Sequence, residues 1–339
     1  TRTAGVLYAG TDDGKVHMTR DGGKTWTDIT TRFPGVPKNA YVSRLTASAH
    51  DVNVVYATFD GHRQNDFETH IYASNDYGQT WRSIVSNLKG EIARTLTEDL
   101  KNPDVLYLGT ETGLFVTLDR GRKWSRIRAN LPTVRIDEIV LHPRDNAMIL
   151  ATHGRAIWVL DSLSPIQEYA AAESTTAGAR LFTLPPYAMY RRPARDRNYE
   201  FWGDQVFYGE NPPQAAVISW LLKQDVGAVK LQIADASGRE VRDISGQVLA
   251  HANKAGIQSA CWDLRVQPAP AAALGAGRGG RSGDEQGGGR QGGQGGGQPQ
   301  RSPFGAGCPT GTPAFGGFGG GGGSVPGPWV LPGVYTVDL

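Results

Sequence analysis

The 339-residue sequence predicts an all-β fold, in which a β-propeller is followed by a β-sandwich. The first observation is an eight-residue phrase that occurs three times, as TRDGGKTW at residues 19–26, SNDYGQTW at 74–81 and TLDRGRKW at 117–124. The second is its context, because each copy follows an apolar strand, a polar loop and a short alternating strand. Repeated units of this kind are typical of propeller blades with four antiparallel strands each.

The spacing of the phrase fits one blade per copy. Its Asp residues, Asp21, Asp76 and Asp119, are 55 and 43 residues apart, the length of four short strands with a variable loop. A sandwich would not explain this fixed placement. A fourth unit, MILATHGRAIWVLD at 148–161, aligns with the others but lacks the phrase. The first unit lacks its first strand, so we expect about four blades here, further blades upstream and an incomplete ring.

The architecture is expected to change after residue 164. We assign residues 1–164 to the propeller, 165–215 to a linker or crossing segment, and 216–339 to a second strand-rich module. An Asp-Ala-Ser-Gly turn at 235–238, between alternating apolar residues, is a hairpin signal. The module resembles a small immunoglobulin-like β-sandwich. The Gly-rich stretch at about 270–327 cannot bury a core, so we expect a disordered insertion there.

The repeated phrase has a structural interpretation. Its Asp can accept hydrogen bonds from its own turn, its fifth residue is a Gly that permits positive φ, and its Trp can fill the space between blades. None of these residues forms a nucleophile–base pair. We therefore assign structural roles to Asp21, Gly23, Trp26, Asp76, Gly78, Trp81, Asp119, Gly121 and Trp124.

The pattern S/T-x-D-x-G-x-T-W resembles the Asp-box, or BNR, repeat of sialidases, xyloglucanases and the sortilin family. The first two boxes match at every defined position, whereas the third has Lys123 in place of Thr. The stretches HRQNDFETHIYASNDYGQTW, GTETGLFVTLD and ATHGRAIWVLD resemble large exported bacterial proteins described as sortilin-N-terminal-like or glycosyl-hydrolase-like, as do GENPP at 209–213 and WDLR at 262–265. This resemblance implies a secreted, periplasmic or cell-surface location.

The box also indicates which end of the propeller carries a site. It is the turn between the third and fourth strands of a blade, so the loops between the second and third strands lie at the opposite end. By resemblance to Asp-box enzymes, that opposite end holds the active site. Our candidates there are Asp12, Asp66 and Glu111 as catalytic carboxylates, and His62, Arg63, His153, Arg155 and Trp158 as ligand-binding residues.

Two functions stay open. One is a binding module that holds a glycan or peptide on this face, and the other is a glycoside hydrolase that uses two of the carboxylates as acid and base. A purely architectural role in a surface assembly is a third alternative. Each candidate could also have a purely structural role. Asp12 and Glu111 could be turn residues, the loop at 60–70 could simply be solvated, and Arg155 could form a structural ion pair with Glu111 or Asp161. A sialidase-like site would require several of Arg44, Arg63, Arg94 and Arg155 to converge.

Composition excludes some partners. The net charge of +2 and the scattered Lys and Arg residues give no basis for nucleic-acid binding, and no run of 18 apolar residues could span a membrane. No metal or cofactor is expected. The i, i+4, i+8 spacing of His62, Asp66 and His70 would place them on one face of a helix, but this segment is predicted to be a loop and a strand. Whether Cys261 and Cys308 pair, and the oligomeric state, remain open.

Overall fold

The computed structural model describes residues 3–189, 213, 215–268 and 327–339. The chain divides into two compact units, residues 1–171 and residues 172–339. The predicted Gly-rich insertion lies outside the described residues except for its last position, and so does the GENPP motif except for Pro213. Among the described residues, no helix has the length and apolar character needed to cross a membrane.

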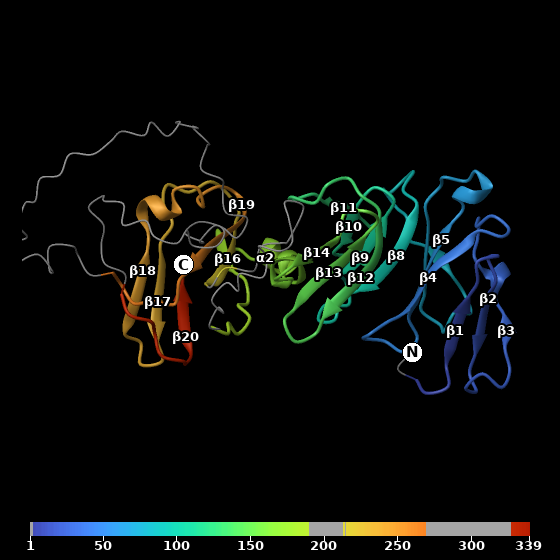
Figure 1. The fold of residues 1–339 in the computed structure, drawn as a ribbon, viewed down its shortest axis with the longest axis horizontal. Helices are drawn as coiled ribbons and strands as arrows, with labels where there is room; N and C mark the ends of the chain where they lie inside the picture. Colours follow the sequence, from blue (N-terminus) through green and yellow to red (C-terminus); the bar gives the residue numbers. More distant parts are fainter. Residues whose placement is uncertain (1–2, 190–212, 214, 269–326) are drawn as a thin grey trace, which may run out of the picture. The chain divides into compact units, whose positions relative to one another are not determined.

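The first unit contains four antiparallel sheets in its described residues, and in each sheet neighbouring strands are also consecutive in the chain (Figure 1). The first sheet comprises β1 (Leu7–Gly10), β2 (Val16–Thr19) and β3 (Thr27–Asp28), and the second comprises β4 (Tyr41–Ala47), β5 (Val55–Asp60), β6 (His70–Ser74) and β7 (Arg82–Ser83). The third comprises β8 (Ala93–Glu98), β9 (Leu106–Thr110), β10 (Leu114–Thr117) and β11 (Trp124–Ile127), and the fourth comprises β12 (Ile136–His142), β13 (Ala147–Thr152) and β14 (Ile157–Leu160).

These sheets are the predicted blades, and the all-β propeller fold is confirmed. The second and third blades have all four strands, and the first begins with its second strand, as the sequence predicts. Among the described residues the fourth blade, whose unit lacks the box, has three strands. Short 3₁₀ turns, η1 (Thr30–Arg32) and η2 (His62–Gln64), follow β3 and β5. Two short helices, α1 (Ser164–Gln167) and α2 (Tyr169–Ser174), follow the fourth blade.

Each blade packs on the next through alternating apolar side chains. In β5, Val55, Ala57 and Phe59 belong to the core shared with the first blade, whereas Tyr56 belongs to the core shared with the third. The strand is therefore buried on both faces, which explains why its sequence reads as a nearly continuous apolar run. A fully buried side chain such as Phe59 contributes about 1.5–3 kcal/mol through its removal from water.

The first strands of successive blades are joined by a repeated side-chain contact. The hydroxyl of Thr46 in β4 donates to the carbonyl of Leu96 in β8 at 2.7 Å. The hydroxyl of Thr97 in β8 donates to the carbonyl of Ile139 in β12 at 3.1 Å. Thr46 and Thr97 occupy equivalent register positions, so the same bond connects the second blade to the third and the third to the fourth.

The three boxes form the same turn. In the second box, Oδ1 of Asp76 accepts the backbone N–H of Thr80 at 2.9 Å, and Oδ2 accepts the Thr80 hydroxyl at 2.6 Å. Asp21 makes the corresponding bonds with Thr25 in the first box. In the third box, Asp119 accepts the backbone N–H of Lys123 at 2.9 Å, but the side chain of Lys123 supplies no hydroxyl.

The box tryptophans differ in burial. Trp81 is 7% exposed in the core between the first two blades, and Trp124 is 3% exposed in the core between the second and third. Trp26 is 44% exposed, so within the described residues it does not fill an inter-blade core. The indole N–H groups of Trp26 and Trp81 donate to the carbonyls of Gly23 and Gly78 in their own boxes.

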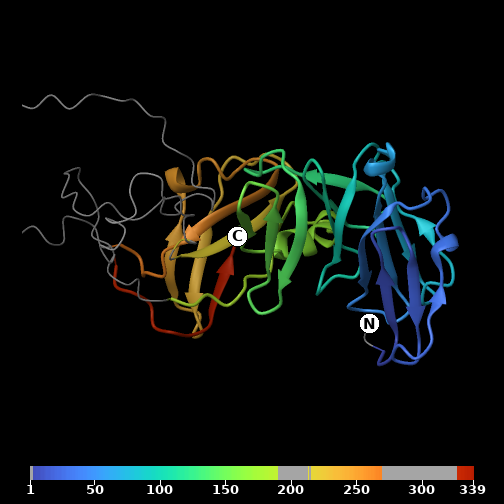
Figure 2. The ribbon, with the colours of Figure 1, turned by 45° about the vertical axis from the view of Figure 1, so that its right-hand side comes forward.

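The second unit contains two three-stranded antiparallel sheets in its described residues (Figure 2, yellow to red strands). One sheet has the order β15 (Ala179–Leu181), β16 (Ala216–Leu222), β19 (Gly256–Trp262), and the other has β18 (Glu240–Ile244), β17 (Leu231–Asp235), β20 (Tyr335–Asp338). A 3₁₀ turn, η4 (Gly246–Leu249), follows β18. The two sheets share one core, in which Trp220 of β16 and Ile233 of β17 are fully buried. The immunoglobulin-like identity of this unit stays a prediction.

The WDLR motif at 262–265 links the end of β19 to the segment around Trp329. The indole N–H of Trp262 donates to the carbonyl of Arg265 at 2.9 Å, and the guanidinium of Arg265 lies 3.8 Å from the centre of the Trp329 ring. The motif therefore connects β19 to the last described segment by a cation–π contact. Cys261, in the same strand, is disulfide-bonded, and Cys308, the other cysteine of the sequence, lies outside the described residues.

Candidate functional site

Each complete blade has two distinct ends. In the second blade, Ser74 at the start of the box pairs with Val55 at the start of β5, whereas His70 pairs with Phe59 near the end of β5. The box and the loop at 60–70 therefore lie at opposite ends of the blade. We call these the box end and the loop end. The first strands β4, β8 and β12 begin at the loop end.

A register irregularity occurs at the same place in all three first strands. The ladder skips one residue after Val42 in β4, after Ala93 in β8 and after Ile136 in β12. The skipped residues are Ser43, Arg94 and Asp137. A β-bulge releases one residue from the pairing and changes the direction of its side chain. Three consecutive blades thus each present one bulged residue near the loop end.

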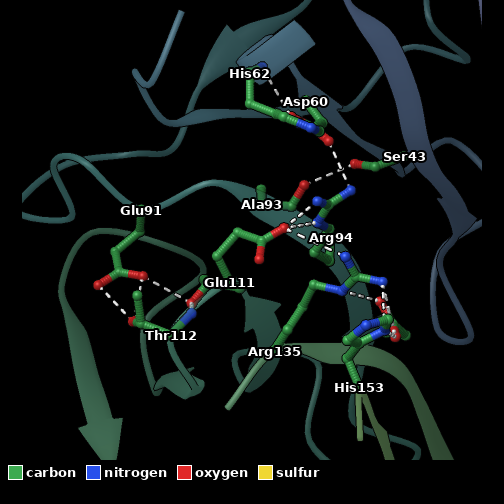
Figure 3. Close-up of polar contacts among 12 residues, drawn as sticks. Ser43, Asp60, His62, Glu91, Ala93, Arg94, Glu111, Thr112, Arg135 and His153 are labelled. Atoms are coloured by element: carbon green, nitrogen blue, oxygen red, sulfur yellow. Dashed lines mark hydrogen bonds and ion pairs between the residues drawn. The ribbon is translucent and has the colours of Figure 1, made fainter. Parts of the chain in front are cut away.

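Arg94 is the centre of a polar network at the loop end (Figure 3). Its Nη1 lies 2.6 Å from Oδ2 of Asp60, which ends the second strand of the preceding blade. Its Nε lies 2.5 Å from Oε1 of Glu111, and its Nη2 also donates to that oxygen. Glu111 directly follows the second strand of the third blade. Arg94 therefore joins the second and third blades through two carboxylates.

Asp60 is the buried member of this network, with 2% of its side chain exposed. Besides Arg94, it accepts the backbone N–H of His62 at 3.0 Å, and the Nδ1 of His62 lies 2.6 Å from its Oδ1. A buried carboxylate is tolerated when its oxygens are paired and hydrogen-bonded, and both oxygens of Asp60 are. The position of His62 is consequently coupled to that of Arg94.

The fourth blade supplies the remaining members. Nε of Arg135 lies 2.7 Å from Oδ1 of Asp137, and its Nη2 lies 2.9 Å from Nδ1 of His153. The Nη1 of Arg135 lies 3.9 Å from Oε1 of Glu111, which connects these residues to Arg94. We call the whole set the loop-end network: Asp60, His62, Arg94, Glu111, Arg135, Asp137 and His153.

The outer part of the network is open to solvent. The side chains of Glu111 and Arg135 are each 30% exposed, and that of His153 is 68% exposed. Arg94 beneath them is 15% exposed. The less exposed pair of Asp60 and Arg94 therefore fixes the positions of hydrogen-bond donors and acceptors that solvent can reach. Such a preorganised arrangement suits the recognition of a polar ligand.

The structure brings three of the sequence-predicted residues together, namely His62, Glu111 and His153. Asp66 lies outside the network, because its Oδ2 is 2.7 Å from Nε2 of His70. Burial disfavours the charge of Asp66, but hydrogen bonds from the Glu68 backbone and from His70 outweigh it and hold the pKa below its usual range. An acid of this kind is a poor proton donor at neutral pH.

The other predicted residues stand apart. Asp12 is exposed, and no hydrogen bond or ion pair joins its side chain to another described residue. The guanidinium of Arg63 lies 5.9 Å from the centre of the Tyr41 ring. The indole N–H of Trp158 donates to the carbonyl of Arg155 at 2.9 Å, which folds that loop on itself.

Sequence reasoning did not assign Asp60, Arg94, Arg135 or Asp137 to the site. Of the four arginines considered for convergence, Arg94 enters the network, whereas Arg44 forms an ion pair with Glu138 of β12, with Nη2 and Oε1 2.6 Å apart. Arg94 and Asp137 are distinguished by the bulge that they share, and a bulge can be recognised only once the pairing of two strands is known. Within the described residues, no group of three or more His, Cys, Asp or Glu side chains is placed to hold a metal ion.

Comparison with protein families gives one match. Residues 69–183 match the family model described as Sortilin, neurotensin receptor 3, of the Sortilin-Vps10 type. This stretch runs from the end of the loop at 60–70 through the fourth blade and beyond α2. The resemblance to sortilin-like proteins is confirmed there. A comparison with curated proteins found no match.

Solved propeller structures are also similar to this chain. A GH74 enzyme from Niastella koreensis is 17% identical over 43% of this chain and 24% of its own, with a TM-score of 0.34. The GH74 xyloglucanase from Xanthomonas campestris is 15% identical over 76% of this chain and 36% of its own, with a TM-score of 0.36. YCF48 bound to D1 peptide is 16% identical over 47% of this chain and 52% of its own, with a TM-score of 0.35.

The chain thus spans between about a quarter and about half of the length of these structures. With such low identities and TM-scores, the assignment of the fold rests on the blade topology of the chain itself and not on these likenesses.

Proposed function

We propose that this chain is part of an exported sortilin-like propeller that binds a glycan or peptide ligand at the loop end. The resemblance of residues 69–183 to the sortilin family supports the secreted or surface location. The proposed site is the loop-end network, with His62, Glu111, Arg135 and His153 as the residues that contact the ligand. Arg63, Arg155, Trp158 and Asp12 are proposed as contacts at the periphery.

The observation that supports this proposal is the network itself. Residues from three blades converge at the end opposite the boxes, and Arg94, itself paired with buried Asp60, holds Glu111, whose side chain is 30% exposed. Charged side chains that serve stability alone gain little from partial exposure, since solvent weakens their attraction. Ligand contacts held by rigid elements are better placed than contacts on free loops.

The contacts favour binding over hydrolysis by the predicted carboxylates. A general acid must offer a proton to the leaving oxygen, whereas Glu111 accepts hydrogen bonds from Arg94. Asp66 is held in its ionised form by His70. Asp12 is the candidate carboxylate without such a contact, and it would need a second acid nearby to hydrolyse a glycosidic bond.

The test uses the full chain on two arrays, one of immobilised polysaccharides and one of immobilised peptides. We expect capture on at least one array, and we expect the Arg135→Ala variant to lose most of it. Arg144→Ala is the matched control, because Arg144 is 82% exposed and pairs with Asp145. Absence of capture on both arrays would refute the proposed function.

A second measurement addresses the alternative. Release of reducing sugar from the captured polysaccharide would be assayed with the wild-type chain and with Glu111→Gln and Asp12→Asn variants. Release that disappears in either variant would establish the chain as a glycoside hydrolase, and the binding proposal would then be replaced.

A further inference from the structure

Two solvent-facing groups of the loop-end network, one oxygen of Glu111 and one nitrogen of Arg135, make no hydrogen bond to the described residues. The Arg94 bonds and the closest approach of Arg135 all go to Oε1 of Glu111, so Oε2 accepts no hydrogen bond from the described residues. Nη2 of Arg135 donates to Asp137 and lies 2.9 Å from Nδ1 of His153, Nε forms only an ion pair with Asp137, and Nη1 donates no hydrogen bond to the described residues. The side chains of Glu111 and Arg135 are each 30% exposed, so a ligand in solution can approach this pair.

These two atoms form an adjacent acceptor and donor. Nη1 of Arg135 lies 3.9 Å from Oε1 of Glu111, too long for a direct hydrogen bond, and Oε2 belongs to the same carboxylate, so one ligand can contact both Nη1 and Oε2. Both side chains are held from behind, Glu111 by Arg94 and Arg135 by Asp137, which reduces the entropy that a ligand must remove on binding.

We propose that Glu111 and Arg135 form a subsite for a vicinal diol of a glycan, an inference that rests on the proposed function and narrows it. One hydroxyl group of the sugar donates to Oε2 of Glu111. The neighbouring hydroxyl accepts from Nη1 of Arg135. Each bond has one charged member, and such bonds are stronger than those between neutral groups. No covalent step is involved, and the sugar remains intact.

The surroundings favour a diol over other ligands. An anionic ligand would meet three carboxylates of the network, Asp60, Glu111 and Asp137, against two guanidinium groups. A peptide bound as an extra strand would need an unpaired strand edge and pockets for its side chains, and the Glu111–Arg135 pair offers neither. A polyhydroxylated ligand supplies a donor and an acceptor on adjacent atoms and requires no apolar pocket.

The test compares intact and periodate-treated polysaccharides, because periodate cleaves the carbon–carbon bond of vicinal diols and leaves most glycosidic linkages in place. Yeast mannan, dextran and xyloglucan would be immobilised, each intact or oxidised and then reduced with borohydride. The full chain would be applied as wild type, Glu111→Gln and Arg135→Lys. Glu173→Gln and Arg144→Lys are the matched controls, since both residues are exposed and outside the network.

We expect capture of at least one intact polysaccharide, and at least about tenfold weaker capture of its oxidised form and by both network variants, which is the loss of one charge-assisted hydrogen bond. The control variants should bind as the wild type does, and circular dichroism would show that every variant is folded. Arg135→Lys keeps the positive charge but removes the planar guanidinium group, so it shows whether capture depends on the charge alone or on the geometry of the donors.

The outcomes distinguish the two proposals. Equal capture of intact and oxidised polysaccharide, or capture that both network variants retain, would overturn the diol subsite while the binding function stands. Capture of peptides alone would do the same. Capture of neither polysaccharides nor peptides would overturn both.

Discussion

The carboxylate of Asp60 lies 2.6 Å from the guanidinium of Arg94, across the boundary between the second and third blades. The two residues are 34 positions apart in the chain, and their side chains are 2% and 15% exposed. This pair both joins two blades and holds the outer residues of the loop-end network, so its loss should affect stability and ligand capture together.

Replacement of Asp60 by Asn should destabilise the first unit by about 2–4 kcal/mol, because it leaves the largely inaccessible guanidinium of Arg94 without one of its charged partners. Thermal unfolding of the full chain, followed by circular dichroism, would measure the effect. Asp104→Asn is the matched control, since Asp104 pairs with Arg120 at 2.7 Å but both side chains are more than half exposed. That change should cost at most about 1 kcal/mol. Equal shifts in the two variants would show that burial of the Asp60 pair is not decisive.

The fifth-position glycines of the three boxes should respond differently to Ala. All three have positive φ, namely +91° at Gly23, +78° at Gly78 and +86° at Gly121. A methyl group on Gly121 would lie 2.8 Å from Cβ of Ile84, whereas one on Gly23 would lie no closer than 3.7 Å to any side chain. Positive φ alone costs about 1 kcal/mol for Ala. We expect Gly121→Ala to be the most destabilising of the three and Gly23→Ala the least.

At Gly78 the nearest atom to an added methyl group is Cε1 of Tyr8 at 3.1 Å, which gives an intermediate expectation. Thermal unfolding of the three variants side by side would establish the order. A larger effect at Gly23 than at Gly121 would contradict the steric explanation.

Lys123→Thr should stabilise the third box. In the first two boxes a Thr hydroxyl donates to Oδ2 of the box Asp at 2.6 Å, and Lys123 offers no such group to Asp119. The added hydrogen bond should contribute about 0.5–1 kcal/mol. Lys123→Ala is the control, because it removes the lysine without adding a hydroxyl. A Thr variant no more stable than the Ala variant would refute this explanation.

The box carboxylates should make the free energy of unfolding depend on pH. Hydrogen bonds from Thr25 lower the pKa of Asp21 to about 2. Burial acts in the opposite direction on Asp76, but hydrogen bonds from Thr80 and Ser74 bring its pKa to about 2 as well. Because the folded pKa lies below the ordinary value of 3.8, this stabilisation is complete above about pH 4 and is lost as the pH falls towards 2.

A Thr80→Val variant isolates this effect at one box. It removes the hydroxyl that favours the ionised form of Asp76, so it should unfold at a lower temperature than the wild type at pH 6. The difference between the two should shrink as the pH falls towards 2, where Asp76 begins to be protonated in the folded wild type as well. Melting temperatures across pH 2–6 would measure it, and a constant difference would argue against the role of Asp76 ionisation.

The blades could be predicted from the sequence because the repeat fixes both the strand order and the turn chemistry. Val55, Tyr56 and Phe59 follow directly from this pattern, since a strand between two neighbours must be apolar on both faces. The family match over residues 69–183 agrees with the same motifs. The sequence also shows the first unit without its first strand and the fourth unit without the box.

The network could not be predicted to the same extent. The direction in which Arg94 points depends on a skipped pair in the ladder of β8 with β9, and register is a property of two strands together. An alignment of the repeats places Asp60 and Glu111 at equivalent positions of the second and third blades. This equivalence is the sequence signal that identifies Asp60 as a candidate residue. Arg135 and His153 lie one position beyond the Ile136–Thr152 pair, and the backbone N–H of His153 donates to the carbonyl of Arg135 at 2.9 Å, so their proximity also depends on the register of two strands.

The shared bulge also bears on how such a protein can change over generations. Ser43, Arg94 and Asp137 are a neutral residue, a cation and an anion at one geometric position of three successive repeats. Since the backbone that presents them is the same, a single codon change in one repeat alters the charge beneath the outer residues of the loop-end network without a new fold. Gene duplication of a repeat would carry a presenting position with it. A propeller built in this way can acquire new specificity one repeat at a time.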